Sequence, residues 1–311
     1  MSGNIVVLGS LNMDLVLTAD RIPKEGETVH GEAMDYLPGG KGANQAVGCA
    51  RLGAAVLMIG AVGRDAFGRM LIESLAANGV RTDGVATCDS ERTGTAVIMR
   101  TQANNRIIVI SGANGELGAE HLSPFEEEFK RSDVLLTQLE IPLETVEYGV
   151  KLARANGVKT ILNPAPAKPL PDSLLQSVDY LTPNETEFEL LCGQPFEDDR
   201  QLESLMKDWV KSYPHQLIVT RGEKGCSYIQ GGVMKTVPSL KVQAVDTTGA
   251  GDAFNAALAA AVAGGKPVDE AVRFAVTASG LSVTKFGAQA GMPTLEEVLA
   301  VGANGGMDAN G

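Results

Sequence analysis

The sequence predicts an α/β fold: a doubly wound, mostly parallel sheet with helices on both faces, and a small β-sheet lid. Most of the 311 residues alternate between short apolar runs and helical patterns, which is typical of a parallel sheet covered by helices. Two segments, 11–37 and 93–111, break this rhythm because they carry alternating strand patterns without a helix between them. We therefore expect these segments to supply the lid strands, with an ordinary edge hairpin as the alternative.

Each element of the large sheet follows from a local pattern. The predicted strands are apolar runs that stop at polar or small residues, and they cover 4–10, 56–60, 134–140, 159–163, 180–182 and 216–220. The predicted helices cover 41–52, 66–78, 143–156, 185–192, 202–212 and 253–263. These elements predict one domain over residues 1–301. The Gly- and Asn-rich stretch 302–311 is expected to be a disordered tail.

The composition limits the class of protein. Hydrophobic residues make up 44% of the chain, which is ample for a core. No stretch approaches the roughly 18–20 uninterrupted apolar residues that span a bilayer. The start of the chain reads as a strand and lacks the basic region of a signal peptide. Four scattered cysteines without a CxxC pair argue against a zinc site or a disulfide framework, so we expect reduced thiols and a cytoplasmic protein.

The net charge is −12, which argues against nucleic acid as a partner because binding to a phosphate backbone requires a basic face. A protein this acidic cannot attract a phosphorylated ligand by its overall field. Any phosphate site in this chain must therefore depend on a metal ion, on local Lys or Arg residues, and on backbone N–H groups.

The most informative motif is the Gly-rich turn 246–252 (DTTGAGD), which opens an Ala-rich helix. Such a turn exposes free backbone N–H groups at the positive end of the helix dipole, where an anion can bind. A carboxylate at Asp252 makes sense there if it takes a proton from an incoming hydroxyl. The amides of Gly249, Ala250 and Gly251 would then hold the transferring phosphoryl group.

Two alternatives remain for this turn. Asp252 could merely complement the helix dipole, as acidic residues in a first turn commonly do. A dinucleotide-binding fold is a weaker alternative, because the third glycine of a GxGxxG motif is missing and Phe254 and Asn255 follow instead.

A second Gly-rich turn, 38–44 (PGGKGAN), also leads into a predicted helix. Gly39 and Gly40 let the backbone approach a polar ligand closely, and Lys41 and Asn44 add directional donors at the same place. The turn is not a P-loop, because the GxxxxGK[ST] spacing is absent. The alternative is a plain Gly-rich turn with a surface lysine.

Polar side chains also follow the first strand and two later ones. Asn12 and Asp14 are two residues apart, so in an extended segment they point the same way, as polyol recognition requires. An Asx-turn is the alternative for this pair. Glu140 ends another predicted strand. The Gly-rich turn 220–225 (TRGEKG) suits an adenosine moiety or simply a hairpin.

Asn184 and Glu187 open a predicted helix, and here the structural alternative is strong. An Asn three residues before a Glu forms an N-terminal capping box that needs no ligand at all. A binding role for this pair therefore does not follow from its spacing alone.

Taken together, these segments resemble the ribokinase family of carbohydrate and nucleoside kinases over residues 4–299. The segment 38–53 (PGGKGANQAVGCARLG) is similar to the family's N-terminal signature, and 246–258 (DTTGAGDAFNAAL) is similar to its C-terminal signature. Both occur in the expected order, which makes the resemblance specific. Shorter segments that are similar to ribokinases rather than to distant members are SGAN (111–114), NPAPA (163–167), PNETE (183–187) and GAQ (287–289).

The resemblance implies an ATP-dependent sugar kinase that phosphorylates D-ribose at the 5-hydroxyl, with Mg²⁺, with K⁺ as an activating cation, and as a homodimer formed through the lid. Its partners would be a small-molecule sugar and ATP, with no nucleic acid or membrane. A sibling kinase for deoxyribose, another sugar or a nucleoside stays open, because the residues do not determine the acceptor. A non-catalytic sugar-binding module is a further alternative.

The resemblance also implies a role for each matching position. Asp252 would be the general base toward the 5-hydroxyl, beside an anion hole of Gly249, Ala250 and Gly251. The positions implied to bind the sugar are Asn12, Asp14, Gly39, Gly40, Lys41, Asn44 and Glu140. The positions implied to bind ATP are Asn184, Thr220, Gly222, Gly225 and Gly251, and Glu187 would act on Mg²⁺ through water. The positions implied to hold K⁺, mostly through backbone carbonyls, are Asp246, Thr248, Ser282, Lys285, Gly287 and Gly291.

Two positions depart from the family's pattern. Ribokinases commonly carry a serine where this chain has Gly291, and that serine contributes to the cation site. Val276 stands where some relatives place a histidine near adenine, so we expect an apolar contact to the base. Neither change touches the residues implied for the chemistry.

Overall fold

A nine-stranded sheet forms the centre of the computed structural model, which describes residues 3–101 and 105–304. The strand order is β13-β12-β11-β10-β9-β8-β1-β4-β5. All neighbours pair in parallel except β11–β12 and β12–β13, which form an antiparallel edge. The strands are β1 (Asn4–Leu8), β4 (Ala55–Gly63), β5 (Arg81–Cys88), β8 (Val134–Thr137), β9 (Lys159–Leu162), β10 (Tyr180–Leu181), β11 (Gln216–Thr220), β12 (Cys226–Gln230) and β13 (Val233–Val237).

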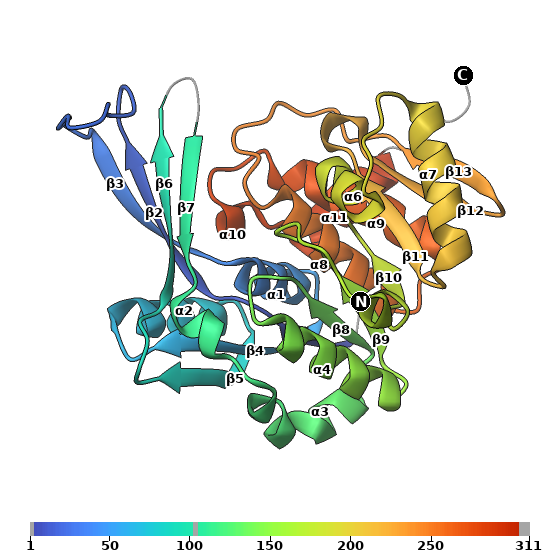
Figure 1. Cartoon of the computed structure of the whole chain (residues 1–311), viewed down its shortest axis with the longest axis horizontal. Helices are drawn as coiled ribbons and strands as arrows, with labels where there is room; N and C mark the ends of the chain where they lie inside the picture. The colour runs from blue at the N-terminus through green and yellow to red at the C-terminus, as the bar shows by residue number, and fades with distance from the viewer. Residues whose placement is uncertain (1–2, 102–104, 305–311) are drawn as a thin grey trace.

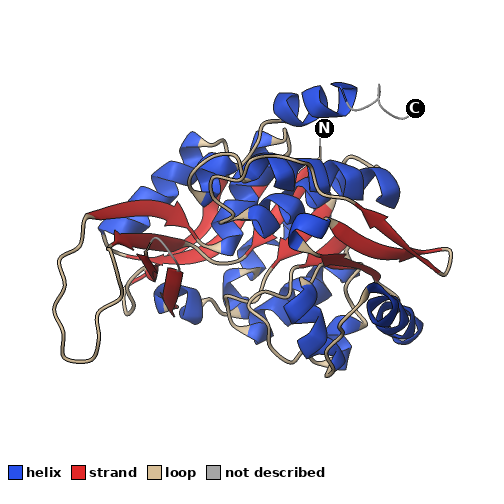
Figure 2. Cartoon of the chain, turned by 90° about the horizontal axis from the view of Figure 1, so that it is seen from above, coloured by secondary structure: helices blue, strands red, loops and turns tan. Residues whose placement is uncertain are grey.

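Helices cover both faces of this sheet, as Figure 2 shows from above. Alternate residues of β1 enter two separate cores: Ile5 and Val7 pack on one side, and Val6 and Leu8 on the other. Both faces are therefore apolar, as expected for a parallel strand buried between helices. The helices are α1 (Lys41–Arg51), α2 (Ala66–Ala77), α3 (Glu126–Arg131), α4 (Leu143–Ala155), α5 (Asp172–Leu175), α6 (Glu185–Cys192), α7 (Asp199–Ser212), α8 (Ala250–Ala263), α9 (Val268–Ser282), α10 (Ala288–Gly291) and α11 (Leu295–Asn304).

Helix α8 lies in the middle of one of these cores and is buried on all sides. Its residues from Ala256 to Ala261 are at most 1% exposed. Small side chains allow neighbouring helices to approach closely: a Cβ atom added to Gly48 of α1 would lie 2.6 Å from the Cβ atom of Ala256. The Ala-rich sequence of α8 thus explains why α1 packs directly against it.

A second sheet of four strands stands to one side of the main body (Figure 1). Its order is β3-β2-β6-β7, with β2 and β6 parallel and the two outer pairs antiparallel. The strands are β2 (Asn12–Thr18), β3 (Ala33–Gly39), β6 (Gly94–Arg100) and β7 (Asn105–Ile110). We refer to these four strands as the lid sheet. A large, mostly parallel sheet with a smaller separate one confirms the predicted fold class.

Some elements were not identified from the sequence. Strand β5 is an edge strand with mixed burial, so its apolar pattern is weak, and the hairpin β12–β13 adds an antiparallel edge to a parallel sheet. The disordered tail was expected to begin at residue 302, but α11 continues to Asn304. A glycine at 302 lowers helix propensity by about 1 kcal/mol without ending a helix whose earlier turn is anchored by the buried Val298. The rest of that expected tail lies outside the described residues.

In the ranges 3–101 and 105–304, none of the helices combines the length and the apolarity needed to cross a bilayer.

Candidate active site

Two neighbouring cavities lie where the carboxyl ends of the strands meet the lid sheet. The larger one has a volume of about 1040 Å³, and its wall includes Lys41 and Asp252. The smaller one has a volume of about 420 Å³ and is lined by Asp14 of the lid sheet. Both cavities share Thr247. The location agrees with the rule that ligands of open α/β sheets bind outside the carboxyl ends of the strands.

The turn before α1 brings the lid sheet to the main body. Gly40 has φ of 88°, and a Cβ atom at this position would lie 2.6 Å from the backbone nitrogen of Asn12 in β2. Only glycine fits both this backbone conformation and this close approach. Lys41 follows as the first residue of α1 and extends into the larger cavity.

Four carboxylates surround Lys41. Burial by itself disfavours the charged ammonium, but Asp252, Glu140, Glu187 and Asp14 outweigh it and raise the pKa of Lys41. The side chain therefore stays positively charged inside an acidic protein. The structure thus brings together five of the side chains singled out from widely separated segments.

Asp252 lies in the first turn of α8 and is only 7% exposed. The turn before it is shaped by Gly249, which caps the helix in the left-handed conformation with φ of 81°. The two carboxylate oxygens accept hydrogen bonds from Asn44 Nδ2 and Gln45 Nε2, both at 2.9 Å. A residue that only complemented the helix dipole would not need two side-chain donors from another helix.

The predicted anion hole also lines the larger cavity. Gly249, Ala250 and Gly251 all contribute to its wall. The amide of Ala250 donates to the carbonyl of Thr247 over 3.3 Å, which is a long hydrogen bond. The first amides of a helix have no partner within the helix, so the amino end of α8 beside Asp252 is suited to an anion.

Glu140 and Asn12 accept hydrogen bonds from several residues, of which Ser10 and Asn114 were not assigned a role. Ser10 Oγ donates to Glu140 Oε2 at 2.5 Å, and the amide of Lys41 donates to the same oxygen at 3.2 Å. Asn114 Nδ2 donates to Asn12 Oδ1 at 2.8 Å. Asn114 belongs to the SGAN segment, whereas no local pattern marks Ser10.

In the wall of the same larger cavity, Asn184 and Glu187 form a reciprocal capping box. The Asn184 side chain accepts from the Glu187 amide and the Glu187 side chain accepts from the Asn184 amide, each at 2.8 Å. Both residues also line the cavity, so the capping role does not exclude a binding role. Burial raises the pKa of Glu187. The remaining predicted ATP positions in this wall are Thr220, Gly222 and Gly225, and Val276 is there as well.

Arg221 is a buried residue of this region that was not singled out. Its side chain is 2% exposed and forms ion pairs with Glu185 at 3.0 Å and with Asp199 at 2.5 Å. It also donates to Ser227 Oγ at 3.2 Å. These contacts tie the turn after β11 to the starts of α6 and α7, which gives the Gly-rich turn a fixed base.

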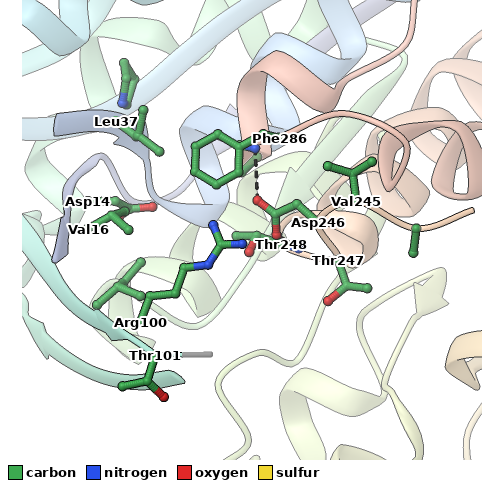
Figure 3. Close-up of a pocket in the computed structure, with 15 residues that line it drawn as sticks. Asp14, Val16, Leu37, Arg100, Thr101, Val245, Asp246, Thr247, Thr248 and Phe286 are labelled. Carbon is green, nitrogen blue, oxygen red and sulfur yellow. Dashed lines mark hydrogen bonds between the residues drawn. The ribbon is translucent and has the colours of Figure 1, made fainter. Parts of the chain in front are cut away.

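Three of the six predicted cation positions, Asp246, Thr248 and Gly287, line the smaller cavity. Figure 3 shows this cavity with Arg100 directed toward Asp246 and Phe286. Asp246 accepts the amides of Thr248 and Gly287, both at 2.9 Å. Partial burial would raise the pKa of Asp246, but these amides, helped by the charge of Arg100, outweigh it and lower the pKa. The guanidinium of Arg100 lies 5.3 Å from the centre of the Phe286 ring.

The departure at Gly291 coincides with a close backbone contact. A Cβ atom at this position would lie 2.6 Å from the carbonyl oxygen of Ser282 and 3.8 Å from that of Lys285. The two carbonyls predicted for the cation site therefore face α10 at the point where a larger residue would need space. The side chain of Lys285 turns away and forms an ion pair with Glu297 at 2.8 Å.

A family model described as the pfkB family of carbohydrate kinases matches residues 2–295. The chain belongs to this family. The match includes both Gly-rich turns and all the strands of both sheets, so the two cavities lie in the shared part of the family's structure.

Individual relatives of this family are similar over nearly the whole chain. A ribokinase of Bacillus subtilis (strain 168) is 45% identical over 295 residues, which cover 95% of this chain and 98% of the relative. A deoxyribokinase of Salmonella typhi is 36% identical over 296 residues, with 94% and 97% covered. The structure of Arabidopsis thaliana ribokinase complexed with ribose and ATP is 37% identical, with a TM-score of 0.91, and 97% and 99% of the two chains are covered.

The carboxyl of Asp14 supplies a prediction about stability. Burial, followed by the charges of Glu140 and Asp252, raises its pKa from 3.8 to about 7. Between these two values the folded chain binds more protons than the unfolded one, so ionisation of Asp14 destabilises the fold as the pH rises. We expect Asp14→Asn to raise the free energy of unfolding at pH 8 by roughly 1–4 kcal/mol. The gain should shrink steadily toward pH 5.

Urea unfolding of the ligand-free protein at both pH values measures this difference. Asp35→Asn, at an exposed position of the neighbouring strand β3, serves as the control and should change stability little at either pH. An Asp14→Asn effect that is the same at pH 5 and pH 8 would contradict the account.

Proposed function

We propose that this chain transfers the γ-phosphoryl group of ATP to the 5-hydroxyl of D-ribose, giving ribose 5-phosphate, with Asp252 as the general base. The observation that carries this proposal is the position of Asp252: its carboxylate is buried at the amino end of α8, is oriented by Asn44, and lies in the wall of the larger cavity. Membership of the pfkB family and the similarity to ribokinases support it.

The two substrates would bind at different places in this region. In this proposal ATP occupies the larger cavity, with its phosphates at Asn184 and at the turn of Gly249, Ala250 and Gly251. Thr220, Gly222 and Gly225 line the same wall, and Val276 offers an apolar contact to the base. The sugar lies between Lys41 and the lid sheet. Its hydroxyls would meet Asn12, Asp14, Gly39, Gly40, Asn44 and Glu140.

The chemistry follows from the charges. Asp252 accepts the proton of the attacking hydroxyl as the new P–O bond forms and the bond to ADP breaks. Backbone amides of the turn stabilise the charge on the transferring group, and Lys41 supplies a positive charge in an otherwise acidic site. The transition state of phosphoryl transfer is loose, so positioning contributes more than base strength. Closure of the lid sheet over the sugar would exclude water and limit hydrolysis of ATP.

The residues present fit Mg²⁺ and K⁺. Mg²⁺ keeps several waters and needs only one or two carboxylates besides the phosphates, and Glu187 supplies one in the cavity wall. When bound, Mg²⁺ neutralises phosphate charge. K⁺ prefers carbonyl and other oxygen ligands, which the carboxylate of Asp246 and the carbonyls near Ser282, Lys285 and Gly287 supply beside Thr248.

The lid sheet supports the proposal of a homodimer. Its edge strand β7 exposes four consecutive apolar residues, Ile107 to Ile110, each 52–57% exposed. An exposed apolar edge strand is a template for association, and a second copy of the chain would cover it.

The four cysteines are free thiols, which supports a reducing compartment and hence the proposed cytoplasmic location.

Replacing the base tests the proposal. Asp252→Asn keeps the shape of the side chain but removes its ability to take a proton. We expect kcat with ribose to fall by roughly 10²-fold or more, with ATP binding retained. The measurement is ADP release in a coupled assay, with a thermal melt to verify folding. Near-normal turnover by a folded Asp252→Asn protein would refute the assignment of the base.

The cation site gives a second test. We expect KCl to raise kcat/KM for ribose several-fold over tetramethylammonium chloride at equal ionic strength, and Asp246→Asn to lose most of this difference. The reason is that a carboxylate with a lowered pKa keeps the negative charge on which a cation depends. Equal rates of the unmodified chain in the two salts would contradict the proposed site.

A further inference from the structure

A chain of buried amide side chains lies next to Asp252. Asn163 lines the larger cavity, whereas Gln45 and Gln138 line neither cavity and have no part in the proposed contacts with sugar or ATP. Gln45 and Gln138 are 0% exposed, and Asn163 is 7% exposed. They come from α1 and from the residues directly after β8 and β9. Burying three amides in an apolar core is unfavourable unless their hydrogen bonds are made, so their arrangement requires an explanation.

Gln45 is the centre of this arrangement. Its Nε2 group donates to Asp252 Oδ1 at 2.9 Å and to Asn163 Oδ1 at 3.2 Å. Its Oε1 atom accepts from Gln138 Nε2 at 2.6 Å. Both hydrogens of the amide and its oxygen are therefore engaged, and neither of the two cavities has Gln45 in its wall.

These contacts fix which way the Gln45 amide faces. If it were turned over, its oxygen would face the carboxylate of Asp252 and its NH₂ group would face the NH₂ group of Gln138. Both contacts would be repulsive inside a buried site. The Asp252 carboxylate and the donor from Gln138 thus favour the same orientation of the Gln45 amide.

The carboxylate of Asp252 is consequently held at two points. Asn44 donates to Oδ2 from the sugar side, and Gln45 donates to Oδ1 from the core. Two donors on the two oxygens fix the rotation of the carboxylate plane, which a single donor would leave free. Gln45 does so as a neutral group, without adding a second cation near Lys41.

The same network reaches the phosphate-binding turn. Asn163 Nδ2 donates to the carbonyl of Thr182 at 3.3 Å, and Thr182 Oγ1 donates to Asn255 Oδ1 at 2.6 Å. Asn255 Nδ2 then donates to the carbonyl of Gly251 at 2.9 Å. Gln45 is therefore linked both to the proposed base and to the turn that would hold the phosphoryl group.

We propose that Gln45 is a positioning residue for the phosphoryl transfer, which orients Asp252 toward the sugar hydroxyl and is itself oriented by Gln138. This inference rests on the proposed function of Asp252. Because Gln45 does not touch either substrate, its loss should lower kcat and leave the KM values for ribose and ATP nearly unchanged. A displacement of about 1 Å in a reacting group is enough to lower a rate by roughly 10²-fold.

The test compares Gln45→Met, which keeps the length of the side chain, with the unmodified protein. We expect kcat to fall by roughly 10- to 100-fold, with both KM values within about threefold. Thr137→Val is the matched control: its hydroxyl is equally buried, one residue from Gln138, and has no hydrogen-bond partner among the described residues. The control should keep both kcat and stability.

Gln45→Glu gives a readout that a merely structural role would not produce. The introduced carboxylate repels Asp252 when ionised and can donate a hydrogen bond to it when protonated. We expect its kcat relative to the unmodified protein to rise as the pH falls from 8 to 6. Asp14 and Glu187, whose pKa values are raised, are present in both proteins, so taking the ratio reduces their contribution. Lys41 stays charged over this range because its pKa is raised.

If Gln45→Met does not fold, the role of Gln45 is tested with Gln138→Met instead. This variant removes the hydrogen bond that Gln138 donates to the Gln45 amide. Its kcat should fall by about 3- to 10-fold at unchanged KM. The proposal is overturned if the folded variants keep kcat, or if the Gln45→Glu ratio is independent of pH. Failure of the proposed function would look different, since the unmodified protein would then release no ADP in response to ribose.

Discussion

The close packing of α1 against α8 is the constraint on which the rest of the site depends. It is possible because both helices present small residues to one another: Gly48 faces Ala256 with no room for a Cβ atom. This contact brings Asn44 and Gln45 onto Asp252, although these residues are more than 200 positions apart in the chain. The orientation of one carboxylate is thus a consequence of how two helices pack in the core.

The second feature of the site is that its positive charge comes from few groups in an acidic protein. The whole chain carries a net charge of −12, and four carboxylates converge on Lys41. A site that receives ATP must therefore obtain its positive potential locally, from one ammonium group and from the backbone amides at the start of α8. The pKa of Asp14 is raised for related reasons: burial, followed by the charges of Glu140 and Asp252, makes its ionisation unfavourable in the ligand-free protein.

The sequence was sufficient for those features that local patterns encode. Alternating strand and helix signals predicted the large sheet, and the Gly-rich turns indicated Lys41, Asn44 and Asp252 as candidate site residues. The start of α1 at Lys41 was predicted correctly, whereas α8 begins at Ala250, three residues before the expected start at 253. Long-range partners could not be predicted. Gln45 occupies an ordinary helical position, and Ser10 follows a strand like any small residue; only the fold reveals that one reaches Asp252 and the other Glu140.

Local sequence patterns also did not predict several elements at the edges of the structure. Strands β5 and β13 have mixed burial, so their apolar residues show little regular alternation. Strand β12 is a short, almost fully buried run that pairs antiparallel at the edge of a parallel sheet. The extension of α11 to Asn304 depends on tertiary packing of Val298, which overrides the glycine that marked the expected boundary. The pairing of Arg100 with Phe286 likewise joins the lid sheet to a distant loop.

The measurement that tests the central claim most directly is ADP release across a panel of acceptors: D-ribose, 2-deoxyribose, fructose and adenosine, each with saturating ATP and Mg²⁺. The account predicts the highest kcat/KM with D-ribose. A preference for 2-deoxyribose or another acceptor would keep the family and the base but change the substrate. No acceptor-dependent ADP release with any of the four would contradict the account and favour a sugar-binding module without catalysis.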